Sequence, residues 1–167
     1  MSVLDFISPD RAVAENGFAP VLRSPLEHEL AHAPAGVEDL SLALGKLDVS
    51  GEVAGLSLPG AEVVPVAPGR ALVLCPYERT AELREQLSGR FHVVDQTGAL
   101  AVLEVEGERL LLRLTDLDLS RLPATGRVAH VRTLVLRDGE RFRLVFPQEY
   151  GDYLVEVVTD ALKGLAS

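Results

Sequence analysis

From Val37 onward, most apolar residues recur at every second position, a period that is typical of β-strands. Asp138-Gly139 lies between two such runs, Val128–Leu136 and Phe142–Phe146. Because both positions of a tight hairpin turn favour residues that tolerate positive φ, this dipeptide predicts a β-hairpin. The segment Gln148–Lys163 instead repeats apolar residues every three to four positions, which predicts an amphipathic helix lying on a sheet. The apolar positions of this helix and of the residues that follow are Tyr150, Leu154, Val157, Val158, Ala161 and Leu165.

Two Ser-Pro steps mark helix starts in the N-terminal region, because serine caps a helix and proline suits its first turn. The first step, Ser8-Pro9, lies in a segment that we expect to form an arm over residues 1–23. The second, Ser24-Pro25, predicts a short helix that ends shortly before Pro34, since the residue before a proline avoids helical conformation. Residues 24–167 are predicted to form a single domain.

Four landmarks occur twice in the same order: a strand pattern ending in Gly-Glu, a Leu-Pro step, a strand pattern ending in proline, and an amphipathic helix. The Gly-Glu pairs begin at Gly51 and Gly107, which lie 56 residues apart, whereas Pro76 and Pro147 lie 71 residues apart. The second copy therefore holds 15 more residues, largely in Arg109–Leu122, where the leucine spacing predicts a helix.

The repeat predicts two strand–helix–hairpin–helix units, at about residues 37–94 and 95–165, with the first helix of the first unit nearly lost. Strands arranged as hairpins, with helices packed on the sheet, make an α+β fold with an antiparallel or mixed sheet. The alternative is that two similar α+β units share only common local patterns.

Composition and charge restrict the classes of function. The chain has 167 residues, of which 47% are apolar and 25% charged, the balance of a soluble protein with a core. Its net charge of −9 makes a phosphate backbone an unfavourable partner, so we expect no nucleic acid. No apolar run is long enough to span a membrane, and the N-terminus has no basic leader region. We expect a cytoplasmic protein without a membrane partner.

His28-Glu29-Leu30-Ala31-His32 matches the pattern His-Glu-x-x-His, in which two histidines one helical turn apart bind zinc and the glutamate activates water. Against a zinc site, Leu26 and Leu30 form the apolar side of this helix, and His28 lies about 200° around the axis from Leu26. The histidines are therefore expected to face solvent, and we favour no metal site. The candidates for a third ligand would be Glu38 and Asp39.

Three other features could carry chemistry. Cys75 is the single cysteine, which excludes a disulfide framework, and its place at a strand end predicts a buried thiol without a nucleophilic role. His130 and Arg132 alternate with apolar residues in one predicted strand, on the face of Val128, Leu134 and Leu136, so they are candidate pocket residues for an anion or a structural pair. Eight arginines lie between Arg109 and Arg143, a density typical of surfaces that bind carboxylates or proteins.

Two segments resemble a known family. Ala35–Ser41, which contains G-Hyd-x-D-Hyd-S (Hyd, a hydrophobic residue), leads into Leu44–Gly51, which contains G-x-Hyd-x-V-x-G. This order resembles the start of aminomethyltransferase (glycine-cleavage T-protein) domains, and Val93–Gly107 looks like a second such strand. Over about residues 24–162, the chain is most similar to the gamma subunits of heterotetrameric sarcosine oxidases. The further segments that carry this similarity are Thr115–Leu119, Leu134–Arg137 and Phe142–Tyr153.

The resemblance implies the folate-binding fold of the T-protein superfamily. It carries over no catalytic residue, because the acidic and pterin-binding positions of aminomethyltransferases have no match here. The Lys-Gly-Cys-Tyr signature of the iron–sulfur repair relatives is also missing, since Cys75 lies in Leu74-Cys75-Pro76-Tyr77.

The first hypothesis is therefore a non-catalytic subunit or binding module of a one-carbon or sarcosine-oxidase-type system, with a protein partner or a second copy of itself. The second is a folate-binding aminomethyltransferase-like protein with tetrahydrofolate as ligand. A distant third is a zinc metallohydrolase that uses His28 and His32.

Overall fold

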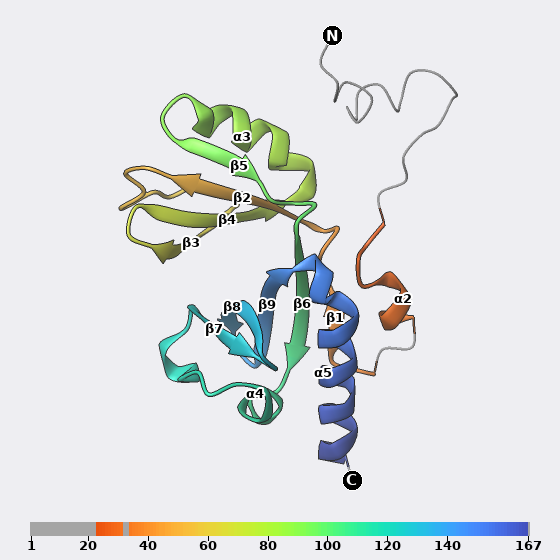
Figure 1. Cartoon of the computed structure of the whole chain (residues 1–167). Coiled ribbons are helices and arrows are strands. Elements are labelled where there is room, and N and C mark those ends of the chain that lie inside the picture. The colour runs from red at the N-terminus through yellow and green to blue at the C-terminus, as the bar shows by residue number, and fades with distance from the viewer. Residues whose placement is uncertain (1–22, 32–33, 167) are drawn as a thin grey trace, which may run out of the picture.

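The computed structural model describes residues 23–31 and 34–166 and contains two antiparallel sheets (Figure 1). The strand order is β1-β6-β9-β8-β7 in one sheet, called sheet A, and β3-β4-β2-β5 in the other, called sheet B. The expected α+β class is confirmed. The Ser8-Pro9 helix, and the expected arm apart from its last residue, lie outside the described residues. The strands are β1 Val37–Asp39, β2 Leu44–Ser50, β3 Glu62–Ala67, β4 Arg70–Pro76, β5 His92–Asp95, β6 Leu100–Glu106, β7 Ala124–Val128, β8 Val131–Asp138 and β9 Arg141–Pro147.

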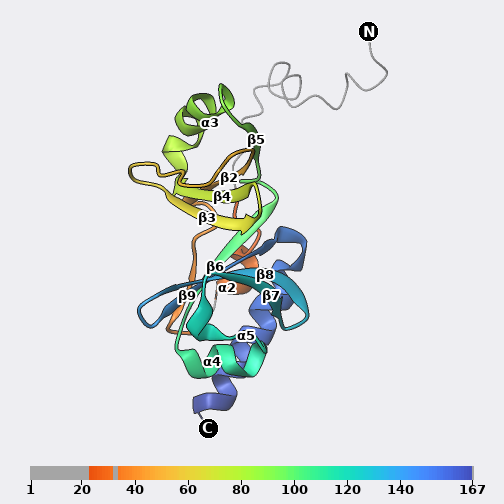
Figure 2. The same cartoon turned by 90° about the vertical axis from the view of Figure 1, so that its left-hand side faces the viewer.

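The two sheets stack face to face, and helices cover their outer faces (Figure 2). Helix α3 lies on sheet B, whereas α4 and α5 lie on sheet A. The α-helices are α2 Glu27–Leu30, α3 Thr80–Ser88, α4 Glu108–Leu114 and α5 Gly151–Ala166, and short 3₁₀ turns are η2 Tyr77–Arg79, η3 Leu119–Arg121 and η4 Gln148–Tyr150. The helix predicted near the C-terminus is thus present as η4 followed by α5, because its apolar stripe packs on the sheet.

Three apolar clusters hold these layers together, as expected from strands that alternate between two faces. One lies between sheet A and its helices and includes Leu103, Phe142 and Leu154. A second lies between sheet B and α3 and includes Leu47 and Leu83. The third joins the two sheets through Val64, Leu72 and Leu74 of sheet B and Val102, Leu134, Leu136 and Val145 of sheet A.

The two sheets share one arrangement of four strands. In sheet B, β2 pairs with β4 from Leu44 opposite Pro76, and in sheet A, β6 pairs with β9 from Leu100 opposite Pro147. Strands β3 and β8 then extend the sheets beyond β4 and β9. Strands β5 and β1 flank β2 and β6 on the other side. Strand β7 is the additional strand, at the edge of sheet A.

The chain crosses between the sheets at two corners, and each corner bonds to the strand that follows the other corner. Before β2, the Asp39 carboxylate accepts the Ser41 N–H (2.8 Å), and the Ser41 hydroxyl accepts the N–H of Val102 in β6 (3.0 Å). Before β6, the Asp95 carboxylate likewise accepts the Thr97 N–H (2.9 Å). The Thr97 hydroxyl accepts the N–H of Lys46 in β2 (3.0 Å). Each crossing is therefore tied to a central strand of the sheet that it leaves.

The expected loss of the first helix of the first unit is complete, since only turns occupy the segment between Gly51 and Glu62. Val53, Leu56, Leu58 and Ala61 of this segment pack on the α3 side of sheet B. The structure corrects the predicted strand Val128–Leu136, which is interrupted because Ala129 and His130 form a turn with φ values of 45° and 70°.

Candidate functional site

The His-Glu-x-x-His motif assembles no metal site in the described part of the chain. The His28 side chain is 95% exposed, and its Nδ1 lies 2.9 Å from the Glu29 carboxylate, which raises the histidine pKa through a hydrogen bond and opposite charge. Leu26 is fully buried, so the helix turns its apolar side inward as predicted. His32 lies outside the described residues. Among residues 23–31 and 34–166, no group of three His, Cys, Asp or Glu side chains is arranged to hold a metal ion.

Cys75 is buried, in agreement with the interpretation of its sequence context. Burial raises the pKa of its thiol, and a hydrogen-bond contact with Thr80 only partly offsets this effect. A thiol with a raised pKa is mostly protonated near neutral pH and is a poor nucleophile. The residue therefore behaves as a small apolar side chain between sheet B and α3.

Three of the eight clustered arginines form ion pairs. Arg137 lies 3.0 Å from Glu108, Arg141 lies 2.7 Å from Glu104, and Arg143 lies 2.7 Å from Glu62, a pair that joins the two sheets. The other five form no ion pair with a carboxylate among the residues that the structure describes. These five are Arg109, Arg113, Arg121, Arg127 and Arg132.

His130 and Arg132 do not form the pair on one strand face that the sequence predicted. His130 sits in the turn between β7 and β8, and Val128 faces the helices rather than the other sheet, because the turn shifts the alternation. Arg132 lies on the inter-sheet face of β8 with Leu134 and Leu136. The two residues consequently border different hollows of the surface.

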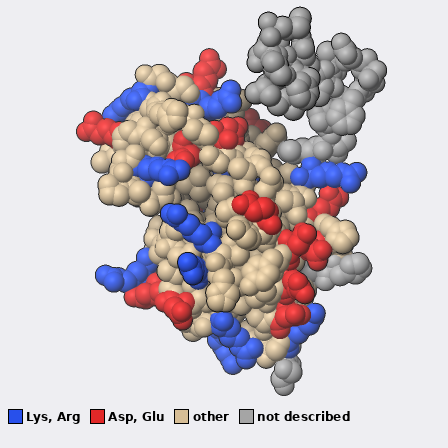
Figure 3. Space-filling view, in the orientation of Figure 1, with Lys and Arg blue, Asp and Glu red and all other residues tan. Residues whose placement is uncertain are grey.

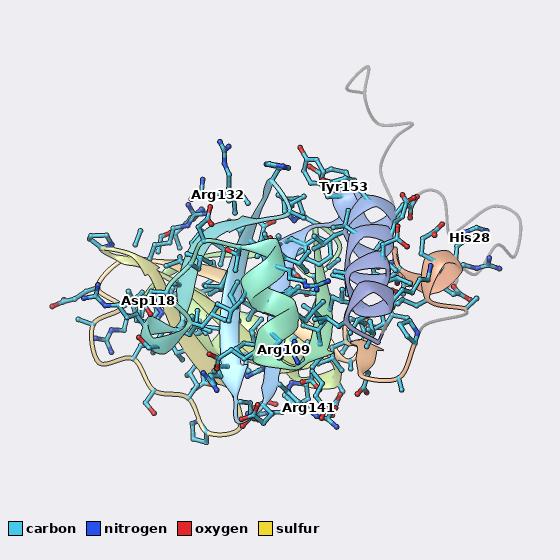
Figure 4. All side chains as sticks on the ribbon, turned by 90° about the horizontal axis from the view of Figure 1, so that it is seen from below. His28, Arg109, Asp118, Arg132, Arg141 and Tyr153 are labelled. Atoms are coloured by element: carbon cyan, nitrogen blue, oxygen red, sulfur yellow. The ribbon has the colours of Figure 1, made fainter. Side chains whose placement is uncertain are left out.

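His130 borders a groove between α4, α5 and the β7–β8 turn, which we call the helix groove. Its apolar residues Leu112 and Tyr153 are 59% and 43% exposed, although large apolar side chains are usually covered. The charged side chains on its border include Arg113 and Asp116, the backbone carbonyl of Arg127 accepts the Thr115 hydroxyl beside them, and Figure 4 shows Tyr153 projecting from α5. An exposed apolar strip with charged residues at its border is typical of a surface that contacts another protein.

Arg132 borders the second hollow, a cleft of about 320 Å³ between the two sheets, which we call the inter-sheet cleft. Sheet B contributes Arg70, whose Nε donates to the Asp48 carboxylate oxygens at 2.8 and 3.0 Å. Figure 3 shows basic side chains on both sides of the hollow between the sheets. Leu72, Leu134 and Val145 form part of its apolar floor. The cleft thus combines an apolar surface with two guanidinium groups from different sheets.

Lys46 is the most unusual polar residue of the core, because its side chain has no exposed surface. Its ammonium donates to the Ser41 carbonyl at 2.7 Å, at the corner before β2. Desolvation lowers its pKa to about 8, while Asp39 and Asp95 act in the opposite direction. The lysine therefore holds the corner before β2 through its hydrogen bond to Ser41. This bond requires a charged group to be buried, which costs free energy.

The sequence reasoning did not identify Lys46, Arg70, Leu112 or Tyr153. Lys46 alternates with apolar residues, a pattern that predicts an exposed strand position. Arg70 lies at the cleft only because the two sheets stack, which the sequence does not show. The signal for Tyr153 was present, since it falls outside the apolar stripe of its helix.

No protein-family model matches the chain, and no curated protein sequence does. The fold is similar to one chain of heterotetrameric sarcosine oxidase from Corynebacterium sp. U-96, solved in complex with pyrrole 2-carboxylate. The TM-score is 0.72, with 18% identity over 87% of this chain and 97% of that chain. It is also similar to the regulatory subunit of aspartate kinase from Thermus thermophilus, in its ligand-free form. That TM-score is 0.51, with 14% identity over 77% of this chain and 99% of the other. Identities this low show a shared fold alone.

In the described part of the chain, no helix has the length and hydropathy that crossing a bilayer requires.

Proposed function

We propose that this chain is a non-catalytic subunit or binding module of a sarcosine-oxidase-type enzyme. The observation that carries the proposal is its similarity to one chain of a heterotetrameric sarcosine oxidase, which extends over nearly the whole of both chains. A protein that only shared a common local motif with that chain would match over a smaller part of its length.

The helix groove supports a protein partner. Its exposed apolar residues, Leu112 and Tyr153, line the same groove as Arg113, and tyrosine and arginine are the residue types that carry much of the energy of protein interfaces. The partner surface that fits this groove is apolar at its centre and carries groups at its border that pair with Arg113 and Asp116. We assign the groove to a larger subunit of the enzyme rather than to a second copy of this chain. The net charge of −9 is a property of the whole chain, and it does not by itself provide a surface that is complementary to the groove.

The proposal includes the T-protein-like fold with an internal duplication. The shared arrangement of four strands, the equal pairing of Leu44 with Pro76 and Leu100 with Pro147, and the reciprocal corners at Ser41 and Thr97 support it. If the two halves were alike only by chance, there would be no reason for the same Asp-x-Ser/Thr turn to precede both β2 and β6.

The experiment is to purify the tagged chain from its native cells and to identify what accompanies it. We expect stoichiometric recovery of a larger chain that contains flavin and oxidises sarcosine. Tyr153→Glu should lower this recovery, since a central interface tyrosine contributes about 2 kcal/mol or more, or about 30-fold in affinity. Recovery of the chain alone, as a monomer or only with itself, would contradict the proposal.

Tyr77→Glu is the matched control. Tyr77 is 45% exposed, close to the 43% of Tyr153, but it lies in η2 beside α3 on the outer side of sheet B. The control variant should recover the partner as the unmodified chain does. Equal losses in both variants would show that the helix groove is not the contact surface, even if a partner is found.

A further inference from the structure

We propose that the inter-sheet cleft binds a small organic carboxylate, with Arg132 and Arg70 holding the carboxylate group and the apolar floor holding the rest of the ligand. This site is separate from the helix groove, and the proposal does not depend on the proposed function.

The first argument is the shape and lining of the cleft. Its volume of about 320 Å³ lies at the lower end of the range for small-molecule sites. Sheet B contributes Val66 and Leu72 to its floor, and sheet A contributes Leu134 and Val145. Thr125 and Gln96 place polar side chains at its border. A few polar groups around an apolar floor are the usual composition of a site for a small amphipathic molecule.

The second argument is the charge that remains after internal pairing. The charged residues that line the cleft are Asp48, Arg70 and Arg132. Asp48 is neutralised by Arg70, so the positive charge of Arg132 is left over. Arg127 lies directly opposite Arg132 across β7 and β8, and two like charges in this position repel each other. An anion beside Arg132 would relieve this repulsion.

The third argument is a comparison within the molecule. The ion pair Asp48–Arg70 on β2 and β4 has its counterpart in Glu104–Arg141 on β6 and β9, at the same places in the strand pairing. The hollow around Arg141 is lined by three glutamates, Glu38, Glu104 and Glu106. The inter-sheet cleft and the hollow around Arg141 thus each contain an equivalent ion pair. The charge that remains beside that pair is positive in the cleft and negative around Arg141. An anion is expected at the Arg132 end and not at the Arg141 end.

The chemistry of the two arginines favours a carboxylate. A guanidinium group donates two parallel N–H bonds to a carboxylate, and it loses less hydration than an ammonium group when it does so. Arg70 is 55% exposed at its side chain, so donors remain for a ligand beside those that Asp48 accepts. The apolar floor then favours a hydrophobic or aromatic body over a small, fully polar anion.

The test uses benzoate as the probe and benzamide, which has the same shape without the charge, as its matched control. Methyl NMR spectra of the full chain should show saturable shifts of Leu134, Leu72 and Val145 with benzoate and much weaker ones with benzamide. Arg132→Gln should weaken benzoate binding about tenfold or more, because a charge-assisted hydrogen-bond pair is lost. Arg141→Gln should leave binding unchanged, and thermal melting should show that both exposed variants stay folded.

Several outcomes would overturn the proposal. Equal binding of benzoate and benzamide would remove the role of the arginines, and equal binding of inorganic phosphate would remove the role of the floor. Equal effects of Arg132→Gln and Arg141→Gln would show that benzoate responds only to the overall charge of the protein and not to a site at Arg132. Saturation of the cleft by a glutamate-rich peptide, without benzoate binding at millimolar concentration, would assign the cleft to a polypeptide instead.

Discussion

Replacing Lys46 with methionine should stabilise the protein at neutral pH, and the gain should disappear as the pH rises. The Lys46 side chain has no exposed surface, and its pKa is lowered from 10.5 to about 8 by desolvation. One pKa unit corresponds to 1.36 kcal/mol, so keeping this lysine charged in the folded protein costs about 3 kcal/mol. Methionine has a similar length and removes this cost.

The substitution also removes the hydrogen bond from Lys46 to the Ser41 carbonyl. Leaving a buried acceptor without a partner costs about 1–2 kcal/mol, so Lys46→Met should gain about 1–2 kcal/mol in net terms at pH 7. Because the folded pKa lies below the unfolded one, the unfolded chain binds more protons between pH 8 and pH 10.5. The stability of the unmodified protein therefore rises with pH in this window relative to the variant.

The assay is urea unfolding, followed by circular dichroism, of both proteins at several pH values from about 7 to about 10. Lys163→Met is the control, since the side chain of Lys163 is 71% exposed. The Cys75 thiol is common to all three proteins, so any effect of its ionisation cancels in the differences. A stability difference that does not change with pH, or a loss of more than about 2 kcal/mol at pH 7, would refute the reasoning.

Three other predictions follow from particular contacts. Gly45→Ala should lower the free energy of unfolding in urea by about 1–3 kcal/mol, because the added Cβ would lie 1.9 Å from the Thr80 hydroxyl. Gly98→Ala is the control and should not destabilise the protein, since no atom lies within 4 Å of its added Cβ. The Cys75 thiol should react with a thiol reagent only after unfolding, and stoichiometric labelling of the folded protein would contradict its burial. Purified protein should hold no stoichiometric zinc by elemental analysis, and His28→Ala should change the unfolding free energy by less than about 0.5 kcal/mol; one zinc per chain, lost in His32→Ala, would reverse this interpretation.

The parts of the fold that could be predicted from the sequence depend on strong local signals. The hairpin predicted at Asp138-Gly139 is present, but its turn lies one residue later, at Gly139 and Glu140, because Asp138 pairs with Arg141 at the end of β8. Of these residues only Gly139 has a positive φ, 60°. Pro76 and Pro147 end strands and precede helices, as proline lacks the N–H that a strand would need. The stripe from Leu154 to Val158 is buried in the helix that packs on sheet A.

The turn at Ala129 and His130 could not be predicted, because neither residue type marks a tight turn. Both adopt positive φ, a conformation that costs energy outside glycine and asparagine. A hydrogen bond from the Ala129 N–H to the Leu114 carbonyl, at 2.7 Å, holds this turn against the end of α4. Tertiary contact thus overrode local preference, and it moved His130 away from Arg132.

The two candidate sites could not be predicted for a different reason. The inter-sheet cleft exists only because strands that lie far apart in the sequence stack, so that Arg70 of β4 and Arg132 of β8 border one hollow. Alternation along a strand tells which residues share a face, but it does not tell which face meets another sheet and which meets helices. Lys46 illustrates this limit, since its position appears exposed in the sequence and is fully buried in the fold.

Both sites lie where the two sheets differ rather than where they agree. Sheets A and B share four strands in one arrangement, and the residues that the second half has in addition form α4, η3 and the approach to β7. Helix α4 brings Leu112 and Arg113 to the helix groove, while β7 brings Thr125 to the cleft. Arg127 lies directly opposite Arg132 on β7 and β8, and side chains that are directly opposite in an antiparallel pair share one face of the sheet. The charge of Arg127 therefore adds to the positive potential around Arg132. This additional charge favours binding of a carboxylate in the cleft, without any movement of the sheets.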